Sequence, residues 1–163
     1  MRSVFDHLGY ILSGTVRPEL SSVDSILKSA ETLADFSAGG FMNVMLQKSS
    51  TLELGYLVYE KIGNDAKAEE LASFQLKFTR FPFPKSNAHR ALGRILQRRG
   101  EGDAAAAHFD KASEAAHLCR CPFLALIAGK DMGGEPGEAI IATACEKMGK
   151  TRSSYVECGF LSA

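Results

Sequence analysis

The sequence has no excess of either sign of charge. Lys and Arg together number 19, as do Asp and Glu, so the formal net charge at pH 7 is zero. Proteins that bind nucleic acid or an anionic membrane through their overall charge carry a clear positive excess. Composition therefore supports neither partner, and only a local cluster of charge can indicate one.

Long apolar runs and metal-binding clusters are also missing. No stretch approaches the roughly 18 consecutive apolar residues of a transmembrane helix, and Asp6 and His7 interrupt the N-terminal segment where a signal peptide would be apolar. Of the 4 cysteines, Cys119 and Cys121 are too close for a zinc knuckle, and the 4 histidines show no metal-ligand spacing. We predict a cytoplasmic protein with reduced thiols, no membrane association, no metal and no cofactor.

Catalytic motifs are equally scarce. The glycine-rich segment 133–137 lacks the Lys and Ser/Thr of a phosphate-binding loop. No nucleophile elbow occurs, and no spacing pairs a cysteine with a histidine as a nucleophile. We therefore expect a protein that is not an enzyme.

What the sequence does contain is a helical period throughout. Apolar residues recur at intervals of three and four, and no segment alternates over the length of a strand. This pattern predicts an all-α protein of eight or nine helices. The expected helices cover residues 4–12, 23–34, 50–62, 66–79, 87–99, 103–119, 122–131 and 138–148, with 41–47 either a short helix or a lead-in.

Local signals set the expected boundaries of these helices. Residues 50–53 read Ser-Thr-Leu-Glu, a capping-box pattern that predicts a helix start. The two prolines of segment 81–84 predict an extended linker whose phenylalanine rings need burial. Segment 133–137 predicts a break between helices, and residues 150–163 show little pattern. We assign N-caps to Asp65, Ser86 and Asp103.

A pair of helices with a tight turn is repeated along the chain. Leu54-Gly55 recurs 38 residues later as Leu92-Gly93, and Gly63 recurs 37 residues later as Gly100. Because Gly93 is small, the two helices of its unit can approach closely. Residues 87–119 resemble a tetratricopeptide repeat, a signature carried by Leu92, Gly93, Gly100, Ala105, Phe109 and Ala112.

The resemblance implies the architecture. Tetratricopeptide repeats are antiparallel helix pairs stacked as a right-handed superhelix, or α-solenoid. We therefore expect one helical-repeat domain spanning residues 1–163. Its expected parts are N-terminal helices (1–48), a degenerate repeat (49–81), the best repeat (86–121), a weak repeat (122–149) and a tail (150–163).

A basic row marks the candidate site. Arg90, Arg94 and Arg98 are spaced by four and so share one helix face. In the family, this side of the first helix lines a concave groove that binds peptides, and some members hold a C-terminal carboxylate there. The resemblance implies partner-binding roles for Asn87, Arg90, Arg94, Gln97 and Arg98, and for Tyr56 and Tyr59 of the preceding repeat.

These residues favour a protein-interaction module or scaffold that binds a peptide segment with acidic groups. An arginine row is, however, usually a solvated helix face. The first alternative function is a structural or regulatory helical domain that associates with itself as a homo-oligomer. The second is a weak nucleic-acid binder that uses the arginine row, although no nucleic-acid motif is present.

Overall fold

The structure is a computed structural model that describes residues 41–157 and residue 161, with side chains from residue 48 onward. The described residues form seven helices and no strand, which confirms the all-α prediction for this part of the chain. The helices expected over 4–12 and 23–34 lie outside it. In order, the helices are α3 (Phe41–Lys61), α4 (Asp65–Phe78), α5 (Pro82–Arg98), α6 (Gly102–Leu118), α7 (Pro122–Met132), α8 (Gly134–Lys147) and α9 (Arg152–Glu157).

The described helices fall into two compact units, with α3 and α4 in the first and α5 to α9 in the second. In the first unit, α3 runs without interruption through Ser50, so the helix start predicted there is wrong. No glycine or proline lies between Phe41 and Glu53, so nothing ends the helix before the capping-box pattern. The buried Ser49 hydroxyl instead accepts a hydrogen bond from the Gln75 side-chain amide across the pair (3.1 Å).

The turn between α3 and α4 contains the expected glycine. Gly63 adopts φ +82°, a left-handed conformation that few other residues tolerate. The N-cap of α4 is Asn64, whose side-chain oxygen accepts from the Lys67 backbone N–H (3.2 Å). The cap therefore lies one residue before the predicted Asp65, which occupies the first turn.

In the described part of the chain, prolines lie in the first turns of helices. Pro82 opens α5 and Pro84 lies in its first turn, so the linker predicted over 81–84 is wrong. Pro122 opens α7, and Pro136 lies in the first turn of α8, so the break predicted over 133–137 shortens to Gly133. Proline suits these positions because the first backbone N–H groups of a helix have no intrahelical acceptor.

Two predicted N-caps also lie inside helices. Ser86 is fully buried within α5, and its hydroxyl donates to the Ala112 carbonyl of α6 (2.8 Å). Asp103 follows the actual cap, Glu101, and lies in the first turn of α6, where a carboxylate is favourable. Short-range sequence signals thus located helices α3 to α8 and predicted the start of α7 at Pro122 correctly, but they placed the first residues of α3, α5 and α8 too late.

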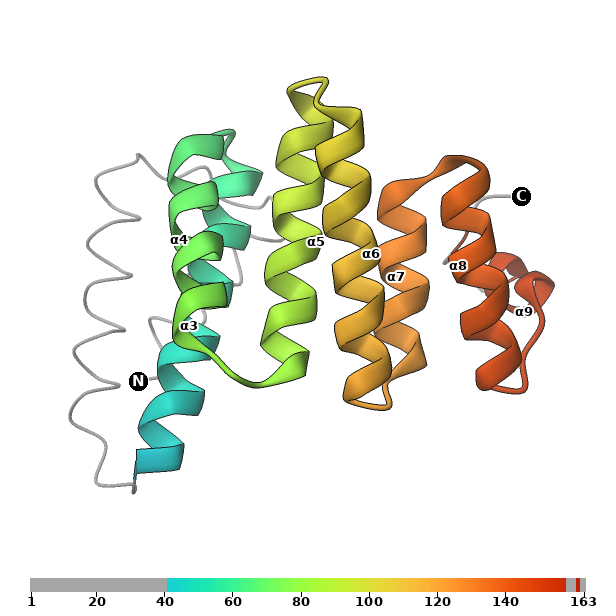
Figure 1. Ribbon diagram of the computed structural model, residues 1–163, viewed down its shortest axis with the longest axis horizontal. Coiled ribbons are helices and arrows are strands. Elements are labelled where there is room, and N and C mark those ends of the chain that lie inside the picture. Colours follow the sequence, from blue (N-terminus) through green and yellow to red (C-terminus); the bar gives the residue numbers. More distant parts are fainter. Residues whose placement is uncertain (1–40, 158–160, 162–163) are drawn as a thin grey trace. The chain divides into compact units, whose positions relative to one another are not determined.

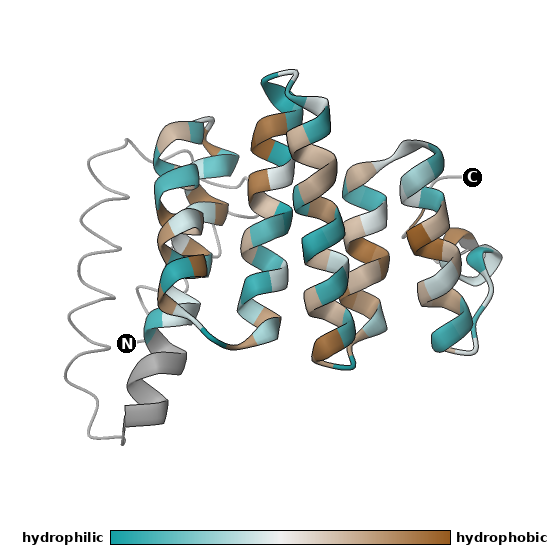
Figure 2. Cartoon of the chain, viewed as in Figure 1, coloured by the Kyte–Doolittle hydropathy of each residue, from teal (hydrophilic) through white to brown (hydrophobic). Residues whose placement is uncertain are grey.

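Helices α5, α6, α7 and α8 run alternately up and down (Figure 1). Each contacts the next, and α5 also contacts α7. Helix α7 is rich in apolar residues, whereas α5 carries more hydrophilic ones (Figure 2). A Cβ atom on Gly93 would lie 2.7 Å from the ring of Phe109, which confirms the predicted close approach of α5 and α6 at this glycine.

The C-terminal part of the second unit has its own apolar core. It includes Leu124, Leu126, Ile141 and Leu161, and Tyr155 of α9 packs against it. Residues 150–163, in which the sequence shows little pattern, contain the short helix α9. By contrast Phe81 and Phe83, which we expected to be buried, are 37% and 49% exposed.

None of the helices that the structure describes is both long enough and apolar enough to cross a membrane.

Candidate functional site

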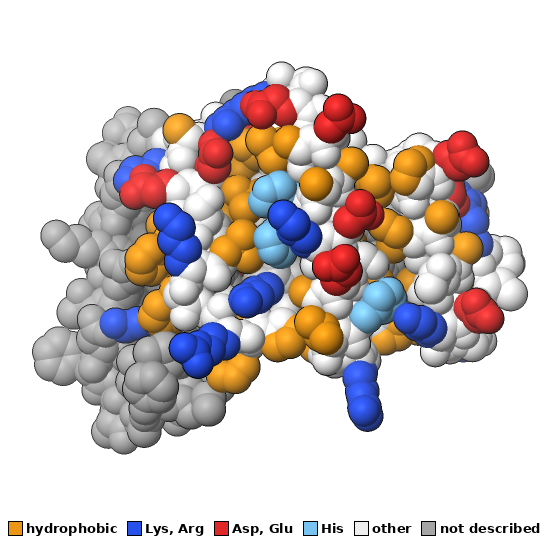
Figure 3. Space-filling view, viewed as in Figure 1, with side chains coloured by type: hydrophobic (Ala, Val, Ile, Leu, Met, Phe, Trp, Pro, Cys, Tyr) orange, Lys and Arg blue, Asp and Glu red, His pale blue; other side chains and the backbone are white. Residues whose placement is uncertain are grey.

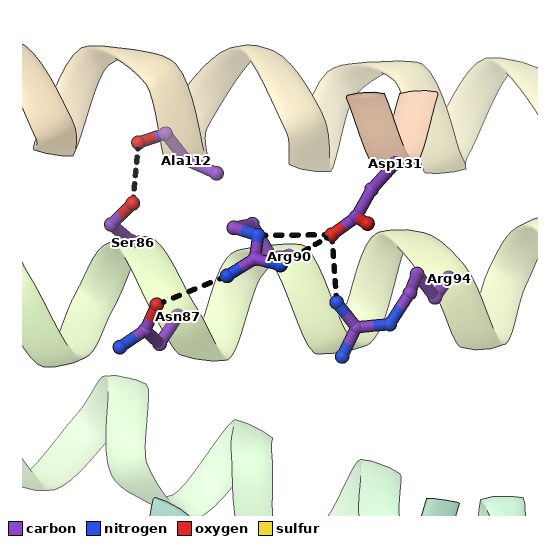
Figure 4. Close-up of polar contacts among 6 residues, drawn as sticks. All are labelled: Ser86, Asn87, Arg90, Arg94, Ala112 and Asp131. Carbon is purple, nitrogen blue, oxygen red and sulfur yellow. Dashed lines mark hydrogen bonds and ion pairs between the residues drawn. The ribbon is translucent and has the colours of Figure 1, made fainter. Parts of the chain in front are cut away.

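Two of the three arginines in the basic row converge on one carboxylate. Arg90 donates to Asp131 Oδ2 through Nε (2.9 Å) and Nη2 (2.7 Å). Arg94 donates to the same oxygen through Nη1 (2.7 Å). Figure 4 shows both guanidinium groups directed from α5 toward Asp131 at the end of α7. This cluster of Arg90, Arg94 and Asp131, hereafter the arginine cluster, links residues about 40 positions apart in the sequence.

The arginine cluster is largely withdrawn from solvent. The side chains of Arg90, Arg94 and Asp131 are 16%, 22% and 17% exposed. The solvated helix face considered from the sequence therefore does not describe Arg90 or Arg94. Because partial burial lowers the local dielectric, charge interactions here are stronger than on an open surface. Both guanidinium groups share the Asp131 carboxylate.

Polar side chains next to the arginine cluster extend it along α5. The Asn87 side-chain oxygen accepts from Arg90 Nη1 (3.4 Å), and Figure 4 shows the two side chains next to each other. The Gln97 side-chain amide donates to the Met132 carbonyl at the end of α7 (3.2 Å). Arg98, the third arginine of the row, is exposed at the end of α5. The sequence thus identified the α5 residues of the cluster and missed its carboxylate.

The two tyrosines predicted to line the same groove are buried residues of the first unit. Tyr56 and Tyr59 belong to α3 in the first unit and are 0% and 1% exposed. A ring buried to this extent contributes to the core of its unit and offers no surface to a partner.

A pair of histidines was missed by the sequence reasoning. His89 of α5 and His108 of α6 bring their Nδ1 atoms to 3.1 Å, with ring centroids 5.1 Å apart. Burial, followed by the charges of His108, Lys111 and Lys85, lowers the pKa of His89 to about 4. Burial and Lys111 also lower the pKa of His108. Figure 3 shows histidine side chains reaching the surface beside basic side chains.

Two further features of the second unit are a basic cavity and three thiols. The cavity has a volume of about 290 Å³ and is lined by His117, Arg120, Cys121, Pro122 and Lys147. Cys119, Cys121 and Cys145 are free cysteines. Burial raises the pKa of the Cys145 thiol, which makes it a poor nucleophile. Within the described residues, no group of three or more His, Cys, Asp or Glu side chains could hold a metal ion.

Comparison with known proteins adds nothing to this geometry. No family model, no curated protein and no solved structure matches the chain. The functional argument therefore depends on the arginine cluster itself.

Proposed function

We propose that the chain is a protein-interaction module that binds an acidic peptide segment at the arginine cluster. The observation that carries the proposal is the convergence of Arg90 and Arg94 on one carboxylate oxygen of Asp131. An arginine pair that holds an internal carboxylate in this way has the geometry to hold a carboxylate of a partner.

Charge supports this assignment. The cluster contains two guanidinium groups and one carboxylate, and one oxygen, Asp131 Oδ2, accepts three hydrogen bonds from Arg90 and Arg94. A carboxylate entering from a peptide would add a second negative group beside the two guanidinium groups. Its affinity would be favoured by the partial burial of both arginines, since charge-assisted hydrogen bonds strengthen away from bulk water.

The helix arrangement gives the second line of support. Helix α5 contacts α6 and α7, and α7 in turn contacts α8. We interpret α5–α6 and α7–α8 as two stacked tetratricopeptide-like repeats, in which α5 and α7 are the first helices. In such a stack the first helices line the concave face, and Arg90, Arg94 and Asp131 belong to them.

The test is binding of a fluorescent acidic peptide with a free C-terminal carboxylate, measured by anisotropy. We expect Arg90→Ala and Arg94→Ala each to weaken binding by about tenfold or more, because a hydrogen bond to a charged group contributes about 1.5 to 3 kcal/mol. Asp131→Asn should strengthen binding, since it removes the internal competitor. The matched control is Arg152→Ala, which removes an exposed arginine paired with Glu138 and should leave binding unchanged.

Other outcomes separate this proposal from its alternatives. Unchanged peptide affinity in both Arg90→Ala and Arg94→Ala would show that the arginine cluster is a structural link between α5 and α7. Displacement of the peptide by a single-stranded oligonucleotide, with an affinity that falls steeply as salt rises, would favour nucleic acid. A dimer whose dissociation follows the same substitutions would favour self-association.

A further inference from the structure

We propose that His89 and His108 form a two-histidine site for a divalent transition metal ion such as Ni²⁺ or Zn²⁺. The site lies between α5 and α6, and it is independent of the function proposed for the arginine cluster.

The separation of the two ring nitrogens carries the inference. A transition metal lies about 2.0 to 2.1 Å from an imidazole nitrogen. Two such ligands that meet the metal at about 90 to 110° are themselves separated by about 2.8 to 3.4 Å. The Nδ1 atoms of His89 and His108 are 3.1 Å apart, within this range.

The backbone around the pair is already fixed. Ser86 precedes His89 by one helical turn, and its hydroxyl is bonded to the Ala112 carbonyl, one turn after His108. Gly93 follows His89 by one turn and packs against the ring of Phe109, the residue next to His108. Contacts between α5 and α6 thus hold the helices together on both sides of the histidines. A preorganised pair of ligands loses little freedom when it binds a metal.

The chemical state of the rings also suits a metal. A histidine must be neutral to donate a lone pair, and the lowered pKa values of both histidines keep them neutral at pH 7. Both rings are half-buried, so water can complete the coordination sphere. No third His, Cys, Asp or Glu joins them among the described residues. Lys111 and Lys85 add positive charge nearby, which predicts modest affinity.

The site should prefer nitrogen-seeking metals. Imidazole ligands favour Ni²⁺, Cu²⁺ and Zn²⁺ over Mg²⁺ and Ca²⁺, which prefer oxygen. Ni²⁺ is the probe of choice because Cu²⁺ would oxidise the free thiols and Zn²⁺ prefers thiolate ligands more strongly.

The experiment is titration of the full chain with Ni²⁺ by calorimetry, with Mg²⁺ as the negative control ion. We expect His89→Gln and His108→Gln each to weaken Ni²⁺ binding by on the order of 100-fold, because each leaves a single imidazole in place of a linked pair. His117→Gln is the matched control, since the partner of His117 is Lys147 rather than a second histidine. Lys111→Gln should strengthen binding by removing a repulsive charge.

A second measurement needs no variant. Paramagnetic Ni²⁺ should broaden the imidazole NMR signals of His89 and His108 at substoichiometric metal, before that of His117. Equal Ni²⁺ affinity in the wild type, His89→Gln and His108→Gln, or uniform broadening of all histidine signals, would overturn the proposal. The two rings would then share an Nδ1–H···Nδ1 hydrogen bond and nothing more.

Discussion

The two helix pairs of the second unit are both joined at glycine, but in different ways. Between α5 and α6, Gly93 makes room for the ring of Phe109. Between α7 and α8, Gly129 and Gly137 bring two backbones into direct contact, because a Cβ atom on Gly129 would lie 2.6 Å from the Gly137 carbonyl oxygen. The first contact can adjust by moving a side chain, and the second cannot.

This difference matters for where polar chemistry can occur. The α5–α6 pair leaves space at its surface for half-buried side chains, and His89 meets His108 there. The α7–α8 contact is closed by backbone atoms. Packing through a side chain therefore leaves room for a cluster between helices, whereas backbone contact gives a closer and less adaptable joint.

The largest expected effect comes from removing the ring that fills the α5–α6 contact. Phe109 is 1% exposed, so Phe109→Ala should leave a cavity against Gly93. We expect it to lower the free energy of unfolding by about 3 to 5 kcal/mol. Chemical denaturation of the full chain measures the change. The control is Phe83→Ala at a 49% exposed ring, which should change stability by less than about 0.5 kcal/mol. Equal losses in the two variants would contradict the packing described here.

The next effect compares the two glycine contacts directly. Gly137→Ala places a methyl group against the Gly129 carbonyl, which belongs to the backbone of α7 and has little room to move. We expect a loss of about 3 kcal/mol for Gly137→Ala and about 1 kcal/mol for Gly93→Ala. In Gly93→Ala the ring of Phe109 can shift, and alanine is also the better helix former.

A double substitution sharpens the comparison. Phe109→Leu should reduce the loss of unfolding free energy caused by Gly93→Ala, because a smaller side chain leaves space for the new methyl group. The same Phe109→Leu change should be additive with Gly137→Ala, whose clash is with backbone. The distinction between the two contacts would be wrong if Phe109→Leu changed the unfolding free-energy cost of Gly137→Ala and left the cost of Gly93→Ala unchanged.

Contacts within a short segment were the part that the sequence could predict. The spacing of Leu92, Gly93, Ala105 and Phe109 follows from the geometry of one helix, a tight turn and a second helix. All four are buried in the structure. The row of Arg90 and Arg94 was visible for the same reason, since a spacing of four places residues on one helix face.

Polar contacts between helices were not predictable from the same patterns. Asp131 lies 41 residues after Arg90, and nothing in its own neighbourhood marks it as a partner. His89 and His108 are 19 residues apart on two helices, and their meeting depends on how those helices are rotated against each other. The helix starts at Pro82 and Gly134 were missed because proline and glycine signal both the end of one helix and the first turn of the next.

The smallest expected effect is a pH dependence confined to the α5–α6 contact. The pKa of His89 falls from the ordinary 6.5 to about 4 in the folded chain, so the unfolded chain binds more protons between these values. Stability contributed by neutral His89 is therefore fully present above pH 6.5 and is lost as pH falls toward 4. Because the ring is only half-buried, solvent screening limits the loss to about 1 kcal/mol.

Hydrogen exchange in the presence of a chelator measures this loss helix by helix. Amides of α5 and α6 should lose protection as the pH is lowered, after correction for the intrinsic exchange rate, while those of α8 should change less. Replacing both histidines, His89→Gln with His108→Gln, should remove the pH dependence, because no proton is then taken up at either position on unfolding. A loss of protection that persists in this double variant would place the titrating group elsewhere. The stability of the contact between α5 and α6 would then depend on pH no more than that of the contact between α7 and α8.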